Sequence, residues 1–306
     1  MRKRRPLPLR KGDVVAIVAP AGPVDPARLS RGIARLSAAG FVPETAEGIL
    51  DRDGFLAGDD GHRAAQLDWA LTLPEARAVM AARGGYGTTR LLPLIDWTKA
   101  ARRRKLLVGY SDVTAILSYA ATRLGLPAVH GPMAAADLAL RPDAEALDAF
   151  VRLAAGRVGP REPWGRPCER LRGGAAEGIL CGGCLSVLTA LLGTPYEPDF
   201  RGALLFLEDV KENAYRLDRM LTQWIQSGRI SRIAGIVAGA IAPVGGETVD
   251  DVRKAFAGAG KRLSVPVWYG FPAGHEGRNF ALPFGVRARI DGRGRLFLLE
   301  SPVARG

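Results

Sequence analysis

The stretch Lys105-Leu106-Leu107-Val108-Gly109-Tyr110-Ser111-Asp112 joins an apolar segment to residues 113–124, in which apolar side chains recur at helical spacing. We predict a buried strand followed at once by a helix, with Ser111 at the junction. At such a junction the first helical N–H groups lack partners, and the helix dipole favours negative charge. Ser111 is therefore either a nucleophile whose oxyanion these groups stabilise, or a helix cap, which is the usual role of Ser and Asp there.

The same strand-then-helix pattern repeats on the N-terminal side of this stretch. Strands are predicted over residues 14–19, 41–45 and 76–82, and helices over residues 26–39 and 61–72. Repeated units of this kind indicate an α/β fold with a parallel sheet, whose ligands bind at the carboxyl ends of the strands.

The C-terminal half has a more mixed pattern. The predicted strands are 203–208, 233–240 and 265–269, with a hairpin at 286–290 and 296–299; the predicted helices are 185–192, 215–226 and 249–256. Between the halves, residues 141–172 are rich in Gly and Pro and lack periodicity, which is typical of a connection. We divide the chain into an N-terminal domain (1–140), a connection (141–175) and a C-terminal domain (176–306).

Composition excludes several classes of protein. Of the 306 residues, 47% are hydrophobic and 24% charged, and no apolar run is long enough to span a membrane, which indicates a soluble globular protein. Residues 1–10 are basic but lead into no signal-peptide core, so we expect a cytoplasmic protein. The net charge of +12 comes mostly from dispersed arginines, without interleaved aromatics. This argues against nucleic-acid binding and favours a site for small anionic or carboxylate ligands.

The cysteines do not indicate a metal or redox site. Cys181-Gly182-Gly183-Cys184 has the C-x-x-C spacing, but no histidine lies within 50 residues of it. The predicted helix also begins after the second cysteine, where a redox pair needs it at the first. We expect three reduced thiols, with Cys181 and Cys184 as small buried residues, and no metal.

Only three histidines are available as a general base. His62 lies on a predicted helix and is expected at the surface, and His130 ends a strand, where a structural hydrogen bond is expected. His275 lies in a glycine-flanked loop after a strand, where functional residues concentrate. Glu208 ends an apolar strand and is the candidate to orient His275, although it could instead pair with an arginine such as Arg216.

Several motifs, taken together in order and at the right spacing, resemble the LD-carboxypeptidase family of serine peptidases. They are Lys11-Gly12-Asp13, Arg83-Gly84-Gly85-Tyr86-Gly87, Gly109-Tyr110-Ser111-Asp112, His130-Gly131-Pro132-Met133, Gly193-Thr194-Pro195-Tyr196, Leu207-Glu208-Asp209-Val210, Gly274-His275 and Leu282-Pro283-Phe284-Gly285. The resemblance covers nearly the whole chain. It implies an N-terminal parallel-sheet α/β sandwich domain and a smaller, β-rich α+β C-terminal domain.

The resemblance also implies an activity. Members of the family remove the terminal D-alanine from the L,D-bond of murein tetrapeptides during cell-wall recycling, commonly as homodimers and without a metal or cofactor. It implies that Ser111 is the nucleophile, His275 the general base and Glu208 its orienting acid. The backbone N–H groups of Asp112 and Gly85 would form the oxyanion hole.

The leaving group carries a free D-amino-acid carboxylate, for which Arg83, Arg278 and Asn279 are the candidate binding residues. One departure from the family is Cys184, which stands where asparagine is usual, and a thiol holds a loop less well than an amide. Two alternatives stay open: a sister-branch peptidase that cleaves a peptide-nucleotide or aminoacyl-nucleotide antibiotic for self-immunity, and a non-catalytic binder of murein peptides or polyanions.

Overall fold

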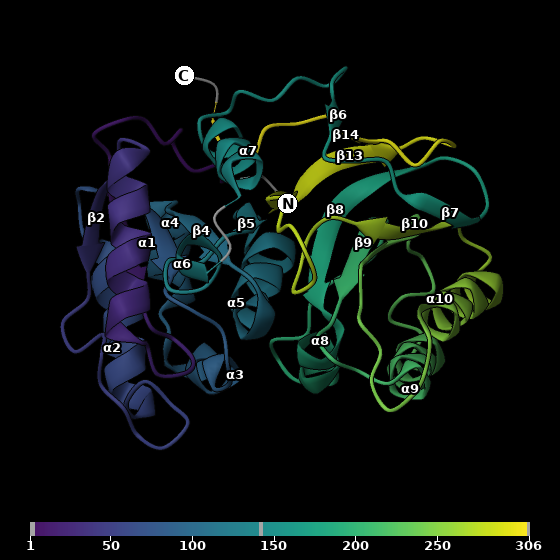
Figure 1. The fold of residues 1–306 in the computed structure, drawn as a ribbon, viewed down its shortest axis with the longest axis horizontal. Helices are drawn as coiled ribbons and strands as arrows, with labels where there is room; N and C mark the ends of the chain where they lie inside the picture. Colours follow the sequence, from purple (N-terminus) through teal and green to yellow (C-terminus); the bar gives the residue numbers. More distant parts are fainter. Residues whose placement is uncertain (1–3, 141–142, 305–306) are drawn as a thin grey trace.

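The structure is a computed structural model that describes residues 4–140 and 143–304. A six-stranded sheet lies in the half of the molecule coloured purple to blue in Figure 1. Five strands run parallel in the order β5-β4-β3-β1-β2. Their bounds are β1 (Val14–Val18), β2 (Val42–Thr45), β3 (Ala76–Ala81), β4 (Leu106–Gly109) and β5 (Ala128–His130). The predicted parallel sheet is confirmed, with strand ends shifted by one or two residues.

Helices cover this sheet where the sequence predicts them. In α1 (Pro26–Ala38) the side chain of Asp25 accepts from the backbone N of Arg28, and Pro26 occupies the first turn. Both features favour a helix start, because proline has no N–H to leave unpaired. The other helices of this half are α2 (Asp60–Thr72), α3 (Thr88–Leu91), α4 (Trp97–Arg103), α5 (Thr114–Tyr119) and α6 (Asp137–Leu140), with short turns η1 (Leu92–Leu94), η2 (Ser111–Val113) and η3 (Ala120–Leu124).

An eight-stranded mixed sheet forms the other half, in the order β6-β14-β13-β8-β9-β10-β11-β7. The four central strands β8, β9, β10 and β11 are parallel, and the outer strands are antiparallel. The bounds are β6 (Pro163–Trp164), β7 (Glu169–Arg172), β8 (Ala176–Cys184), β9 (Ala203–Glu208), β10 (Gly235–Gly239), β11 (Val267–Phe271), β13 (Val286–Ile290) and β14 (Leu296–Leu298). The β-rich character expected of the C-terminal half is confirmed.

Three helices pack on this second sheet: α8 (Leu185–Leu191), α9 (Ala214–Gln226) and α10 (Val249–Leu263), of which α9 and α10 lie side by side (Figure 1). The predicted end of α10 at residue 256 is wrong by seven residues. Gly258 and Gly260 weaken the helical pattern there, but packing requires a small residue, since a Cβ at Gly260 would lie 2.2 Å from Cγ2 of Val267.

The segment 141–175 contains more structure than a connection. It includes α7 (Ala144–Ala154), and its strands β6 and β7 occupy the two edges of the second sheet. Arg141 and Pro142 lie outside the described residues. A further strand, β12 (Leu282–Phe284), returns from the C-terminal half and pairs antiparallel with β5 in the first sheet. The proposed domain boundaries stay a prediction; one strand of the C-terminal half, β12, lies in the first sheet.

Helix α5 lies between the two sheets and joins them (Figure 1). The backbone N of Cys184 donates to Oγ1 of Thr114 at 3.1 Å, and the hydroxyl of Ser118 donates to the carbonyl of Gly182. A Cβ at Gly183, whose φ is +129°, would lie 2.5 Å from Thr114 Cγ2. Gly183 therefore allows α5 to approach β8 closely, and Gly182 allows the backbone of Phe206 in β9 to do so, which are packing roles.

Candidate active site

Ser111 follows β4 in a backbone conformation that is rare for a serine. Its φ is +61°, in the left-handed region, and the chain enters η2 and then α5 directly after it. Strained strand-to-helix turns of this kind expose a nucleophile above the end of a sheet. Gly84 packs against it, because a Cβ at Gly84 would lie 2.7 Å from Cβ and 2.8 Å from Oγ of Ser111. The sequence analysis did not single out Gly84 for this role; the paired glycines 84 and 85 were its only signal.

The structure brings Ser111, His275 and Glu208 together. Oγ of Ser111 lies 3.0 Å from Nε2 of His275, and Nδ1 of His275 lies 2.6 Å from Oε2 of Glu208. All three residues follow or end parallel strands, namely β4, β9 and β11, so they meet at carboxyl edges of the two sheets. This is the geometry of a nucleophile, a base and an orienting acid. The alternative partner considered for Glu208, Arg216, pairs with Glu212 instead.

The surroundings of His275 favour its protonated form. Burial lowers the pKa of the imidazole, but the hydrogen bond and charge of Glu208 and the charges of Asp209 and Asp137 raise it more, so the pKa lies above its usual value. Glu208 is fully buried, whereas His275 keeps some exposure to solvent. A buried carboxylate that touches the imidazole stabilises the imidazolium that forms when the serine loses its proton.

Asp112 links the nucleophile to the glycine-rich loop after β3. Its buried side chain accepts from the backbone N of Thr88 at 2.7 Å, at the start of α3. Burial raises the pKa of this carboxyl, and the hydrogen bonds with Thr88 oppose the rise. Gly85, whose φ is +135°, lies in the same glycine-rich loop, which the contact between Asp112 and Thr88 holds next to Ser111. The oxyanion-hole roles of Asp112 and Gly85 stay a prediction.

The three candidate substrate-binding residues differ in the hydrogen bonds and ion pairs that their side chains make within the protein. Arg83 donates from Nε to the carbonyl of Gly84 and from Nη1 to that of Pro23, which holds its guanidinium in the loop that touches Ser111. Arg278 forms ion pairs with Asp143 and Glu145, which neutralise its charge. Arg278 also lines, with Asp137 and Pro132 among others, a hollow of about 660 Å³ that neither Ser111 nor His275 borders.

Asn279, the third candidate substrate-binding residue, is held by hydrogen bonds inside the protein. It is 4% exposed, its Oδ1 accepts from the backbone N of Gly274 at 3.0 Å, and its Nδ2 donates to Asp137 at 3.3 Å. Both ends of the amide are therefore used inside the protein. Sequence reasoning missed Asp137 altogether, because no motif marks it.

The remaining histidines lie away from the serine. His62 lies on α2 at the surface as predicted, with its side chain 30% exposed and Nε2 near Gln66 and the carbonyl of Gly48. His130 is fully buried among Tyr110, Phe206 and Phe284. Neither of its ring nitrogens has a hydrogen-bond partner in the described residues, so the structural hydrogen bond expected of it is absent there.

All three cysteines are buried free thiols. Burial and the nearby charges of Glu208 and Asp209 raise the pKa of Cys184 well above its usual value, so it is not a reactive thiolate. The first turn of α8, directly after Cys184, is held by Asp209, whose carboxylate accepts from the backbone N and the hydroxyl of Ser186. Over residues 4–140 and 143–304, no group of three or more His, Cys, Asp or Glu could hold a metal ion.

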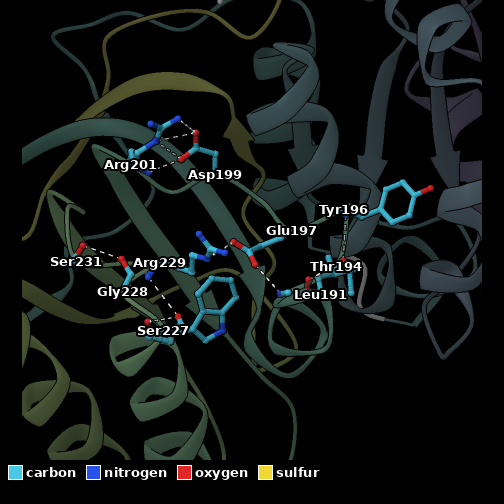
Figure 2. Close-up of polar contacts among 12 residues, drawn as sticks. Leu191, Thr194, Tyr196, Glu197, Asp199, Arg201, Ser227, Gly228, Arg229 and Ser231 are labelled. Carbon is cyan, nitrogen blue, oxygen red and sulfur yellow. Dashed lines mark hydrogen bonds and ion pairs between the residues drawn. The ribbon is translucent and has the colours of Figure 1, made fainter.

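A second polar hollow, of about 290 Å³, lies where η3 meets the second sheet, and four arginines line it: Arg123, Arg201, Arg229 and Arg232. Figure 2 shows two ion pairs here, one between Arg229 and Glu197 and one between Arg201 and Asp199. Glu197 is nearly buried and also accepts from the backbone N of Gly193 at 2.7 Å. These contacts fasten the 193–202 segment to the turn that follows α9.

No helix in the described part of the chain is both long and apolar enough to cross a membrane.

Comparisons with known proteins agree with this architecture. Residues 15–131 match the LD-carboxypeptidase N-terminal domain, and residues 177–290 match the LD-carboxypeptidase C-terminal domain. A Streptomyces coelicolor protein named as a carboxypeptidase is 40% identical over 305 residues, 98% of this chain and 97% of its own length.

Two solved structures extend the comparison. The muramoyltetrapeptide carboxypeptidase from Oxalobacter formigenes is 33% identical, covers 92% of this chain and 97% of its own, and superposes with a TM-score of 0.79. A microcin C7 self-immunity protein superposes with a TM-score of 0.88 over 98% of this chain and 99% of its own, but at 22% identity it shows the fold alone.

Proposed function

The chain belongs to the LD-carboxypeptidase family, and from this premise we propose that it is a serine carboxypeptidase that removes the terminal D-alanine from murein tetrapeptides. The observation that carries the proposal is the contact chain from Ser111 through His275 to the buried Glu208. The muramoyltetrapeptide carboxypeptidase from Oxalobacter formigenes, 33% identical, supports the choice of substrate. We further propose that the protein is a cytoplasmic homodimer, that it acts in peptidoglycan recycling, and that it needs no metal or cofactor.

The contacts support acyl transfer in two steps. Oγ of Ser111 attacks the carbonyl carbon of the L,D-amide while Nε2 of His275 takes the hydroxyl proton. The negative charge on the carbonyl oxygen is stabilised by the backbone N–H groups of Asp112 and Gly85. His275 then gives its proton to the departing amine of D-alanine, and water attacks the acyl-enzyme with His275 again as the base. The carboxylate of Glu208 keeps the imidazole oriented throughout.

Arg83 is the residue we propose for the carboxylate of the leaving group. Its guanidinium is fixed in the loop that packs on Ser111, and Nη2 has no partner among the described residues. A planar guanidinium binds a carboxylate with directed hydrogen bonds. Asn279 and Arg278 are less suited to this role, because their polar atoms already have partners within the chain.

The function is tested by mass spectrometry of murein tetrapeptide incubated with the wild-type protein and with Ser111→Ala. We expect loss of one D-alanine with the wild type only, and the same melting temperature for both proteins. Cleavage by the Ser111→Ala variant would exclude Ser111 as the nucleophile. A wild-type protein that leaves the tetrapeptide intact but hydrolyses an aminoacyl-nucleotide conjugate would move the assignment to the alternative substrate.

A further inference from the structure

Three buried polar side chains near His275 are not members of the proposed triad. Tyr110, Asp137 and Asn279 are 6%, 8% and 4% exposed. They come from three distant parts of the chain: the end of β4, the start of α6 and the loop after β11. Burial of polar groups costs free energy unless they are hydrogen-bonded, so their contacts explain why they are here.

Asp137 is the centre of this group. Its Oδ1 lies 3.3 Å from both the hydroxyl of Tyr110 and Nδ2 of Asn279, and its Oδ2 accepts from the backbone N of Met133 at 3.1 Å. Burial raises the pKa of Asp137, and these hydrogen bonds oppose that rise. Three donors converge on two oxygens, which is the arrangement that an ionised carboxylate satisfies.

The first branch of the network leads to the backbone of the histidine loop. Asn279 accepts at Oδ1 from the backbone N of Gly274, the residue before His275. Gly274 has φ at +109°, and a Cβ there would lie 2.6 Å from Oε2 of Glu208, so only glycine fits. Asp137 thus fixes Asn279, and Asn279 fixes the point where the chain turns toward Glu208.

The second branch leads to the ring of the histidine. Tyr110 donates to Asp137, and its ring meets the ring of His275 edge-on, with centroids 5.0 Å apart. Tyr110 is also the residue before Ser111. One carboxylate therefore restrains the neighbour of the nucleophile and the loop that carries the base.

Asp137 also contributes charge at this place. The charged and titratable groups facing His275 are Glu208 and Asp209 at the end of β9, Asp137 from α6 and His130 from β5. Glu208 touches the imidazole, whereas Asp137 acts on it without contact. When His275 takes the serine proton, the charge of Asp137 adds to those of Glu208 and Asp209 in stabilising the imidazolium in a region of low dielectric.

We propose that Asp137 is a positioning residue for His275, acting through Asn279 on the backbone of the histidine loop, through Tyr110 on the imidazole ring, and through its charge on the imidazolium. This inference rests on the proposed roles of Ser111 and His275. It adds a second carboxylate to the site, which no part of the proposed triad requires.

The test uses Asp137→Asn, which keeps the shape and removes the charge, with Asp218→Asn on the exposed face of α9 as the matched control. The readout is the rate at which a fluorophosphonate phosphonylates Oγ of Ser111 with loss of fluoride, measured from pH 5 to 9. This reaction needs the serine and the base but not the natural substrate. The test therefore stays valid even if the natural substrate is not murein tetrapeptide. If the wild-type protein did not react with the fluorophosphonate, the proposed function itself would be overturned.

We expect Asp137→Asn to lower the phosphonylation rate about tenfold at pH 7, and to move the midpoint of the pH profile down by roughly half a unit or more. Asn279→Ala and Tyr110→Phe keep the charge, so they should lower the rate without moving the midpoint. Melting temperatures identify any variant that fails to fold, and Tyr110→Phe, which loses one hydroxyl, then carries the test. An unchanged rate and midpoint in Asp137→Asn, or an unchanged rate in Tyr110→Phe if only that variant folds, would overturn the proposal.

Discussion

Oε2 of Glu208 faces two nitrogens of His275, the ring Nδ1 at 2.6 Å and the backbone N at 3.2 Å. The same oxygen thus restrains the imidazole and the chain that carries it. Oε1 of Glu208 is buried and has no hydrogen-bond partner among the described residues. The free energy cost of burying this carboxylate is therefore offset chiefly through His275, which is unusual for a purely structural glutamate.

Glu208→Gln should reduce kcat by roughly 10²–10⁴-fold with a small change in KM. The amide keeps the shape of the side chain, but it removes the charge that stabilises imidazolium and can present N–H to Nδ1. Steady-state kinetics on the tetrapeptide measure this. Glu177→Gln, an exposed glutamate on β8 that pairs with Arg287, is the control and should retain full kcat. Equal losses in the two variants would contradict a specific role for Glu208.

Gly84→Ala should reduce kcat by about 10²-fold, because its Cβ would displace Cβ and Oγ of Ser111 from hydrogen-bond distance of His275. The matched control is Gly258→Ala in α10, where a Cβ meets nothing within 4 Å. That change should keep full activity and stabilise the protein by about 0.5–1 kcal/mol, since alanine is the better helix former. A fully active Gly84→Ala variant would show that the close packing is not needed.

The acid limb of kcat/KM against pH should have a midpoint above 6.5. The base must be neutral to accept a proton, and its surroundings raise the pKa of His275, so activity rises only as pH passes through that higher value. The effect on stability has the opposite sign. The protonated His275 stabilises the folded state fully below pH 6.5, and this contribution is lost as pH rises through the folded-state pKa. A midpoint below 6.5 would be inconsistent with this electrostatic environment.

His130 should make the folded protein less stable in acid. Burial lowers its pKa to about 4, whereas the unfolded chain takes up the proton near pH 6.5. The free energy of unfolding should therefore fall by about 2 kcal/mol from this residue between pH 7 and pH 5. Urea unfolding of the wild type and of His130→Phe at both pH values measures the contribution of His130 to this loss of stability. The two proteins losing equal stability would show that His130 is not neutral and buried in solution.

Glu197→Ala should lower the free energy of unfolding by about 1–3 kcal/mol and leave kcat unchanged. The change removes the partner of the Gly193 N–H and of Arg229 in the cluster shown in Figure 2. Arg229→Ala is the companion variant: its side chain is 58% exposed, so its loss should cost less than about 1 kcal/mol. If Arg229→Ala lowered the free energy of unfolding more than Glu197→Ala does, Glu197 would not be the main stabilising residue of this cluster.

Much of the fold could be predicted because its signals are local. The apolar run before Ala19 and the proline at the start of α1 mark an element within a few residues, and both are confirmed. β8 was missed because its glycines, required where α5 and the backbone of β9 lie close to it, interrupt the pattern of a strand. β12 was missed because three residues carry no period, and only pairing with β5 makes them a strand.

The sequence by itself determined the parallel βα units, the identity of the candidate nucleophile, base and acid, and the family resemblance that relates them, since these are properties of residue type and order. Only the tertiary structure decided that Ser111 and His275, 164 residues apart, lie within a hydrogen bond. It also decided that the amide of Asn279 bonds to Gly274 and Asp137. Such distances depend on how α5 packs against β8 and on how the histidine loop closes, and no local periodicity encodes that packing.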